Sequence, residues 1–245
     1  MKLNIIKSVT VITPTIGSIK VLDAIKSVQN QTYENLTHLL VIDGPEYIEA
    51  FQKLQVPLQV DTPITLTCSP FNTGANGFYG HRIYSAYPHL IDSDYISFLD
   101  EDNWYEPEHI ESLVDTIEST GSDWVHSLRS VHAPDGSFAI ADKCESLGKY
   151  PIYGDERNGY LVDTSSYLFK RSWLIQNCQL WHSGWGADRN FFNLIRGGSR
   201  WQGTGRHTLC YRLDGNPGSP KIDFFIKGNE ITSAKYAGVM PWTKK

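Results

Sequence analysis

The chain has 245 residues, which suits one α/β domain better than two full domains. Its 22 Lys and Arg residues against 27 Asp and Glu residues give a formal charge of −5, so composition offers no electrostatic case for a nucleic-acid partner. Hydrophobic residues make up 40% of the chain, as in globular proteins, but no apolar run is long enough for a transmembrane helix or a signal peptide.

The first half of the chain alternates strand and helix signals. Short apolar or β-branched runs ended by turn residues predict strands over residues 9–13, 38–42, 64–68 and 95–99. Apolar residues at helical spacing predict helices over residues 19–28, 78–87 and 106–120. This alternation with short connections predicts a doubly wound, mostly parallel, Rossmann-like α/β sheet.

After residue 121 the alternation breaks down. Residues 125–131 and 138–140 predict a hairpin, and residues 181–188 form an aromatic, glycine-rich stretch ahead of a predicted helix. From about residue 214 the apolar period is lost. We therefore expect residues 216–245 to form a tail or an irregular cover.

Polar residues follow three of the four strands predicted in the first half. Pro14 and Thr15 follow the first strand, Asp43 follows the second, and residues 100–102 follow the fourth. Ligands of open parallel sheets bind beyond the carboxyl ends of the strands, whereas a purely structural repeat needs only turn residues there. These residues are therefore the first indication of a ligand site.

The three acids Asp100, Glu101 and Asp102 are the strongest local signal. In extended backbone, alternate side chains turn toward one ligand, so Asp100 and Asp102 are candidates to hold a hard divalent cation. Mn²⁺ or Mg²⁺ takes carboxylate oxygens together with substrate phosphates and water. The alternative is a solvated acidic turn ahead of a helix whose N-terminus favours acids.

Asp188 is the candidate general base, because it follows a glycine and aromatic stretch at the start of a predicted helix. The alternative is a helix N-cap. Asp43 and the segment from Asn72 to Gly74 have turn formation as their alternative. His207, beside Arg206, is a candidate ligand of a metal or phosphate, against the alternative of an ordinary surface histidine.

Several segments in this order resemble the family 2 glycosyltransferases, which have the nucleotide-sugar-dependent GT-A fold. The resemblance is carried by VTVITPT at residues 9–15, LDAIKSVQNQTY at 22–33, LLVIDG at 39–44, Asn72 with Gly74, FLDEDNWYEP at 98–107, and GAD at 186–188. It is close over residues 9–110 and weaker over 181–195. The linked set is far more specific than any one of its motifs.

The resemblance implies roles for individual residues. Asp43 would accept a hydrogen bond from the base, favouring uracil. Asp102 would bind Mn²⁺ or Mg²⁺ at the diphosphate, and Asp100 would reach the ribose of the nucleotide-sugar or the metal. Asp188 would deprotonate the acceptor hydroxyl. The other residues that would contact the nucleotide-sugar are Pro14, Thr15, Asn72, Gly74, Arg82 and Glu101.

The chain departs from the family pattern at two places. Ala187 stands where the family commonly has Glu, and the Ala-Arg-Asn that follows the Asn-x-Gly turn is absent, so Arg82 is a candidate to replace its arginine. Trp181, Trp185 and Trp104 are candidates to stack on the acceptor sugar, with ordinary core packing as the alternative.

The function implied is metal-dependent, inverting transfer of one sugar from a nucleotide-sugar, with a UDP-sugar favoured, to a glycan or lipid-linked acceptor in polysaccharide biosynthesis. The alternatives are a nucleotidyltransferase on a similar sheet and a non-catalytic module that binds nucleotide or glycan. We expect one GT-A domain over residues 1–215, with a nucleotide-binding half (1–121) and an irregular acceptor-binding half (122–215). We also expect a cytoplasmic location, peripheral at most to a membrane. The widely spaced cysteines favour reduced thiols.

Overall fold

The computed structural model describes residues 6–57, 61–213 and 219–243. Within these residues nine strands form one sheet in the order β3-β2-β1-β4-β8-β6-β9-β5, with β7 paired to β6. The strands are β1 (Val9–Thr15), β2 (Leu36–Ile42), β3 (Ile64–Cys68), β4 (Tyr95–Phe98), β5 (Trp104–Tyr105), β6 (Trp124–His132), β7 (Phe138–Ala141), β8 (Tyr167–Lys170) and β9 (Trp201–Arg212). The helices are α1 (Val21–Gln29), α2 (Ile48–Lys53), α3 (His81–Ala86), α4 (His109–Thr120), α5 (Arg171–Leu174), α6 (Ala187–Ile195) and α7 (Ile222–Lys235).

The sheet is mixed but mostly parallel. β1 pairs in parallel with both β2 and β4, and β3 pairs in parallel with β2. In the second half β6 pairs in parallel with β9, whereas β8, β5 and β7 run antiparallel to their neighbours. The predicted mostly parallel α/β fold is confirmed, and of the antiparallel strands β7 and β8 follow residue 121, where the sequence alternation breaks down, whereas the two-residue β5 precedes it.

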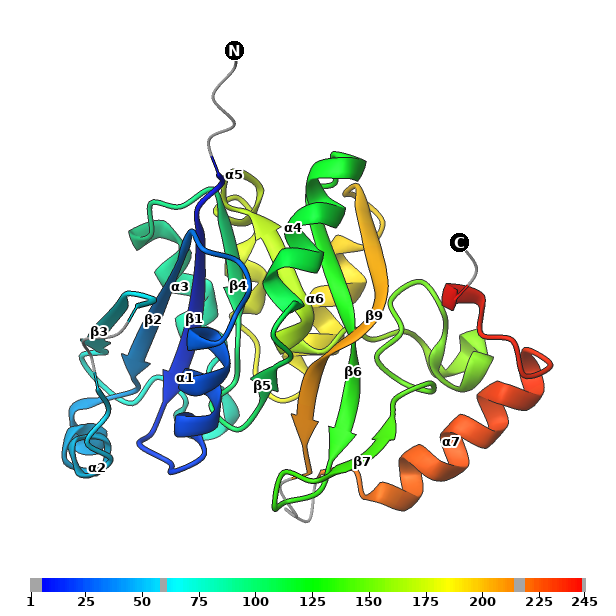
Figure 1. The fold of residues 1–245 in the computed structure, drawn as a ribbon, viewed down its shortest axis with the longest axis horizontal. Coiled ribbons are helices and arrows are strands. Elements are labelled where there is room, and N and C mark those ends of the chain that lie inside the picture. Colours follow the sequence, from blue (N-terminus) through cyan, green and yellow to red (C-terminus); the bar gives the residue numbers. More distant parts are fainter. Residues whose placement is uncertain (1–5, 58–60, 214–218, 244–245) are drawn as a thin grey trace.

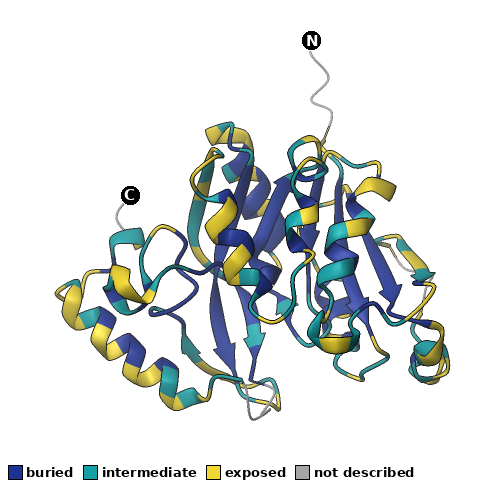
Figure 2. Ribbon diagram, turned by 180° about the vertical axis from the view of Figure 1, so that it is seen from behind, coloured by how far each residue is buried: buried dark blue, intermediate teal, exposed yellow. Residues whose placement is uncertain are grey.

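Helices cover both faces of the sheet (Figure 1). One cluster of buried side chains joins β1 to α1 and α4, and includes Val11, Ala24, Ile110 and Leu113. A second cluster on the other face joins the sheet to α3 and α6, and includes Ile83 and Phe191. Because both faces are covered, β1 is buried along its whole length (Figure 2).

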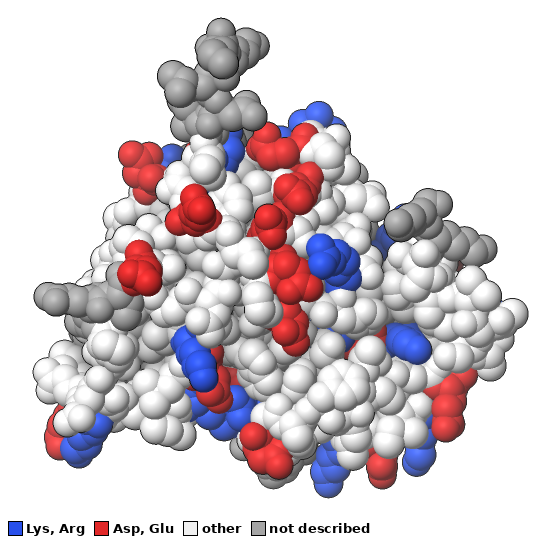
Figure 3. All heavy atoms as spheres, viewed as in Figure 1, with Lys and Arg blue, Asp and Glu red and all other residues white. Residues whose placement is uncertain are grey.

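Acidic side chains gather in a band over α4 on the face shown in Figure 3. The exposed positions of this helix include Glu111, Asp115 and Glu118, while Leu113 and Ile117 face the sheet. The helix thus has the polar and apolar sides that its sequence predicts. Among the described residues, no helix is both long enough and apolar enough to cross a membrane.

The expectation of irregular structure after residue 214 is wrong for α7, a regular helix. Its buried side consists largely of small and polar residues. The side chain of Asn229 bonds to the Lys143 amide and the Ala141 carbonyl, each at 2.8 Å, and a Cβ on Gly228 would lie 2.6 Å from the Cys144 sulfur. Because of these residues, the buried side of α7 does not produce a regular spacing of apolar residues in the sequence. The expected domain boundary at residue 215 lies outside the described residues.

Candidate active site

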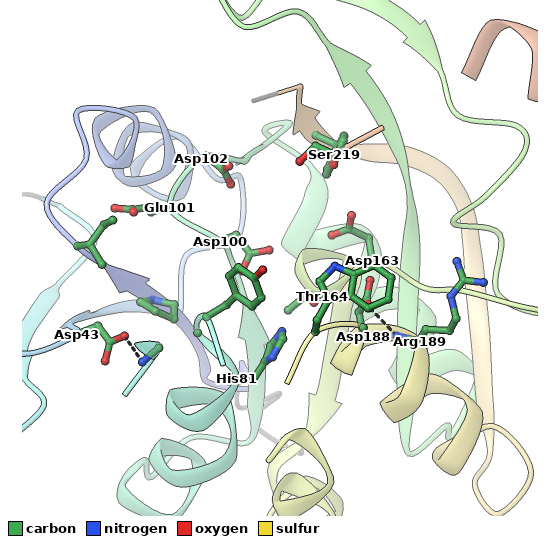
Figure 4. Close-up of a pocket in the computed structure, with 18 of the residues that line it drawn as sticks. Asp43, His81, Asp100, Glu101, Asp102, Asp163, Thr164, Asp188, Arg189 and Ser219 are labelled. Atoms are coloured by element: carbon green, nitrogen blue, oxygen red, sulfur yellow. Dashed lines mark hydrogen bonds between the residues drawn. The ribbon is translucent and has the colours of Figure 1, made fainter. Parts of the chain in front are cut away.

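A cavity of about 1300 Å³ opens beyond the carboxyl ends of β1, β2 and β4 and extends to the start of α6 (Figure 4). Ten of the predicted site residues line it, namely Pro14, Thr15, Asp43, Asn72, Gly74, Asp100, Glu101, Asp102, Trp185 and Asp188. The parallel pairing of β1 with β2 and β4 brings their ends to one edge of the sheet. Residues more than 80 positions apart therefore share one cavity.

Asp43 organises one end of this cavity. Its Oδ1 accepts hydrogen bonds from the amide and the hydroxyl of Thr73, at 2.8 and 2.6 Å, and its Oδ2 accepts one from the Gly74 amide at 2.8 Å. The Asn72 amide group donates to the Tyr47 hydroxyl at 3.0 Å, and Tyr47 also lines the cavity. Asp43 thus forms the turn and also lines the cavity, so its role in the turn is confirmed and its contact with a base stays a prediction.

Arg82 supports the same turn from outside the cavity, contrary to its predicted role. Its Nη1 donates to the Thr73 carbonyl at 3.2 Å, and its guanidinium lies 3.5 Å from the centre of the Phe78 ring. The neighbouring His81 lines the cavity instead. Its Nδ1 lies 3.0 Å from the Ser183 carbonyl, which can only accept, so Nδ1 carries the hydrogen and Nε2 is an acceptor. Burial lowers the pKa of His81, which favours this neutral form.

Asp100 is held by two hydroxyl groups. Tyr84 donates to its Oδ1 at 2.6 Å, and Ser165 lies 3.2 Å from its Oδ2. Burial, and then the charges of Asp102 and Asp163, raise the pKa of Asp100 to about 7. A cation bound nearby would reverse this effect by favouring the carboxylate.

Glu101 ties the loop after β1 to the end of β4. Its Oε2 accepts a hydrogen bond from the Thr15 hydroxyl at 2.6 Å and another from the Ser18 amide at 3.3 Å. Burial raises its pKa to about 6. Glu101 therefore has a structural contact in addition to its place on the cavity wall.

The donor set of the cavity suits Mn²⁺ or Mg²⁺. Asp100 and Asp102 both line the cavity, and so does Glu101 between them, because residues 101–102 form a turn and not the extended backbone that was expected. Within the described part of the chain no group of three or more His, Cys, Asp and Glu side chains is placed to hold a metal. Two protein carboxylates leave coordination positions for diphosphate and water, which these cations accept.

His207 is not part of this site, contrary to its prediction as a metal ligand. It pairs with Leu128 in the middle of the β6–β9 ladder, away from the strand ends that form the cavity. Its Nε2 lies 3.1 Å from the Asp142 carbonyl.

Asp188 lies in the first turn of α6, two residues after Gly186, whose φ of 79° is left-handed. Its Oδ1 accepts a hydrogen bond from the Arg189 amide at 2.7 Å. Burial raises the pKa of Asp188, with a further contribution from Asp163. Figure 4 shows Asp188 and Asp163 side by side on the wall opposite Asp43. Asp188 is thus a carboxylate whose surroundings make it a stronger base than an ordinary aspartate.

A buried ion cluster on the same cavity wall as Asp188 is the main feature that was not predicted from the sequence. The Arg129 guanidinium pairs with Asp142 at 2.9 Å, Glu145 at 2.5 Å and Asp163 at 2.6 Å, and the face of the Tyr211 ring packs against it. Arg129, Glu145 and Asp163 line the cavity. The available signal was an arginine inside a predicted strand, because a charge that such a strand buries needs carboxylate partners.

Of the three tryptophans predicted to stack on the acceptor, only Trp185 lines the cavity, where it is 82% exposed. Trp181 is fully buried, with its ring centre 4.2 Å from that of Phe191. Trp104 lies between the Arg212 guanidinium, at 4.7 Å, and the His132 ring, at 4.6 Å. Trp181 and Trp104 are therefore packing residues, which corrects their predicted role.

Residues 10–174 match the model of the family described as Glycosyl transferase family 2. The chain belongs to this family of glycosyltransferase enzymes. The match covers most of β1, the strands from β2 to β8 and the three acids after β4.

Individual relatives agree with this placement. The glucosyl-dolichyl phosphate glucuronosyltransferase of Haloferax volcanii is 35% identical over 97 residues, which cover 40% of this chain and 29% of that relative. The crystal structure of S. aureus TarS 1–349 aligns with a TM-score of 0.59 at 12% identity, covering 97% of this chain and 67% of the other. Its complex with UDP-GlcNAc aligns with a TM-score of 0.60 at 12% identity, covering 93% and 66%. The likeness to TarS shows a shared GT-A-like fold.

Proposed function

We propose that the chain transfers one sugar from a UDP-sugar to a hydroxyl group of a glycan or lipid-linked acceptor, with a divalent cation and with inversion. The observation that carries this proposal is the shared cavity, which brings together Asp43, the pair Asp100 and Asp102, and Asp188. Two relatives support it, since TarS is known in complexes with UDP and with UDP-GlcNAc. The archaeal relative is named for glucuronosyl transfer to a glucosyl-dolichyl phosphate.

The uracil would lie at the end of the cavity formed by Asp43 and Tyr47. The Asp43 carboxylate already accepts three hydrogen bonds, and its two oxygens have capacity for a fourth, from the N3–H of uracil. Cytosine carries no hydrogen on N3, so this contact would favour UDP over CDP.

Asp100 and Asp102 would hold Mn²⁺ or Mg²⁺ at the diphosphate. When bound, this cation supplies positive charge that stabilises the leaving diphosphate. Glu101 would keep the end of β1 and the loop after it against the end of β4 through its bonds to Thr15 and Ser18. His81, with Nε2 available as an acceptor, would receive a hydrogen bond from a hydroxyl of the donor.

Asp188 would accept the proton of the acceptor hydroxyl as its oxygen attacks the anomeric carbon. A single displacement of this kind inverts the configuration at that carbon. Trp185, exposed at the cavity mouth, would offer its ring face to the acceptor sugar. Ala187 is fully buried, so the position where relatives have Glu points into the core of this chain and not into the cavity.

Family membership favours sugar transfer over the nucleotidyltransferase and binding-module alternatives. A direct test is isothermal titration with UDP, GDP, CDP and dTDP, each with and without Mn²⁺. We expect UDP to bind most tightly and to require Mn²⁺ for full affinity, and we expect Asp102→Ala to lose the Mn²⁺ dependence. Equal binding of all four nucleotides, or none, would contradict the proposed donor.

A further inference from the structure

The hydroxyl of Ser165 contacts Asp100 at two points. Ser165 lies in the short 3-10 helix η6 (Thr164–Ser166) and is fully buried. Its Oγ accepts a hydrogen bond from the Asp100 amide at 3.0 Å and lies 3.2 Å from Asp100 Oδ2, to which it donates. The side-chain amide of Asn103 is a further donor at 3.4 Å. One hydroxyl group thus fixes both the backbone and the carboxylate of Asp100.

Ser165 is itself held firmly from the second half of the chain. Its amide donates to Asp163 Oδ1 at 3.0 Å, and Asp163 Oδ2 accepts from Arg129 at 2.6 Å. The Asp163 amide donates to the Ser146 hydroxyl at 2.9 Å. A continuous series of hydrogen bonds therefore runs from the buried guanidinium on β6 to the carboxylate at the end of β4.

Tyr84 completes the arrangement from the other side. It is fully buried on α3, packs against Phe98 with ring centres 4.4 Å apart, and donates to Asp100 Oδ1. Each oxygen of Asp100 thus receives one hydroxyl hydrogen bond, from elements on either side of the carboxylate. Such contacts fix the direction of the remaining lone pairs, and loss of a partner of this kind commonly weakens metal binding by about 10- to 100-fold.

We propose that Ser165 is a positioning residue for the cation site, because it orients the Asp100 carboxylate and links it to the Arg129 cluster. This inference rests on the proposed function, in which Asp100 and Asp102 hold the cation. Asp100 and Asp102, which would hold the cation, belong to the first half of the chain. Ser165 belongs to the second half, so the second half would contribute to donor binding through the orientation of Asp100.

The adjacent Ser166 provides a matched control. It is also fully buried, and its Oγ has no hydrogen-bond partner in the described part of the structure. Ser165→Ala and Ser166→Ala therefore remove the same atom from neighbouring positions, but only the first removes contacts to Asp100. Ser165→Cys is a second test variant, because it fills the space of the hydroxyl with a weaker hydrogen-bonding group.

The experiment measures two affinities by calorimetry, that of Mn²⁺ for the UDP-bound protein and that of UDP in EDTA. We expect Ser165→Ala and Ser165→Cys to weaken Mn²⁺ binding by about tenfold, with UDP affinity in EDTA unchanged. Ser166→Ala should leave both affinities at the wild-type values. Tyr84→Phe should weaken Mn²⁺ binding as Ser165→Ala does.

Two results would overturn the inference while leaving the proposed function intact. The first is that a folded Ser165→Ala or Ser165→Cys protein binds Mn²⁺ as tightly as the wild type. The second is that Ser166→Ala loses as much Mn²⁺ affinity as the Ser165 variants do. A wild-type protein whose UDP binding gains nothing from Mn²⁺ would overturn both the inference and the proposed function.

Discussion

Burial and the neighbouring carboxylate of Asp163 raise the pKa of Asp188 above the ordinary aspartate value. The Arg189 amide, which bonds to Oδ1, together with the charges of Arg129 and Arg189, limits the rise. The net shift is upward, so the Asp188 carboxylate is a stronger base than an ordinary aspartate, as general-base catalysis requires.

Asp188→Asn tests this role, because it keeps the shape of the side chain and removes its basicity. We predict that the rate of sugar transfer falls by about 10²- to 10⁴-fold, while UDP affinity in the presence of Mn²⁺ is unchanged. Initial rates and calorimetry on the same preparation measure the two quantities. Transfer at the wild-type rate would place the base elsewhere.

The raised pKa of Asp188 also predicts the pH dependence of the reaction. The base acts when deprotonated, so kcat at saturating donor and Mn²⁺ should fall as pH falls through this pKa. Because the pKa is raised, the fall should begin at a higher pH than an ordinary aspartate, with a pKa of about 3.9, would give. A kcat that stays constant down to pH 4 would contradict the assignment.

The strands β1, β2 and β4 place the candidate site by ending at one edge of the sheet. Their positions were predictable because strands covered on both faces have continuous apolar runs, and the polar residues beyond them stand out. The roles of Trp181 and Trp104 were not predictable, since stacking on a sugar and packing in a core require the same ring. The helix α7 was not predicted because three of its buried residues, Gly228, Asn229 and Thr232, are small or polar and give no apolar pattern at helical spacing.

The turn from Asn72 to Gly74 depends on a glycine at its third position. A Cβ on Gly74 would lie 2.5 Å from the Tyr79 carbonyl oxygen and 2.8 Å from Asp43 Oδ2. We therefore predict that Gly74→Ala lowers the free energy of unfolding by about 1–3 kcal/mol and weakens UDP binding. Chemical denaturation and calorimetry measure these effects.

Gly197→Ala is the control for this substitution, because nothing lies within 4 Å of the added Cβ. It should change neither stability nor UDP binding. Unchanged UDP affinity in Gly74→Ala would show that the turn does not contact the nucleotide.

The Arg129 cluster lies in the second half of the chain and connects β6 to the cavity wall, and Asp163 extends it through Ser165 to Asp100 in the first half. The cluster consists of Arg129, Asp142, Glu145 and Asp163. The first and last of these residues are 34 positions apart, and the four have no regular spacing from which the cluster could be predicted. Tertiary structure alone brings them together. Burial tends to raise the pKa of Asp142, but the charge of Arg129 and three backbone hydrogen bonds outweigh it, so the net shift is downward.

Arg129→Met should destabilise the whole fold, because it removes the cation that three buried carboxylates share and leaves Glu145 with only Arg189, at 3.8 Å. We predict a loss of about 3–5 kcal/mol in the free energy of unfolding at pH 7. Arg129 lowers the pKa values of Asp142 and Glu145, so without it we expect both to rise above those of the unfolded chain, and the variant should regain stability as pH falls from 7 to 5. Urea unfolding at both pH values measures this, and a loss that is small or independent of pH would contradict it.

Hydrolysis of the donor by water tests sugar transfer most directly, since it requires no knowledge of the acceptor. The protein is incubated with Mn²⁺ and a panel of UDP-sugars, UDP release is measured, and NMR identifies the anomer released first. We predict that at least one UDP-sugar is hydrolysed with inversion, and that Asp188→Asn abolishes this release. Release with retained configuration, or equal release by Asp188→Asn, would contradict single displacement with Asp188 as the base.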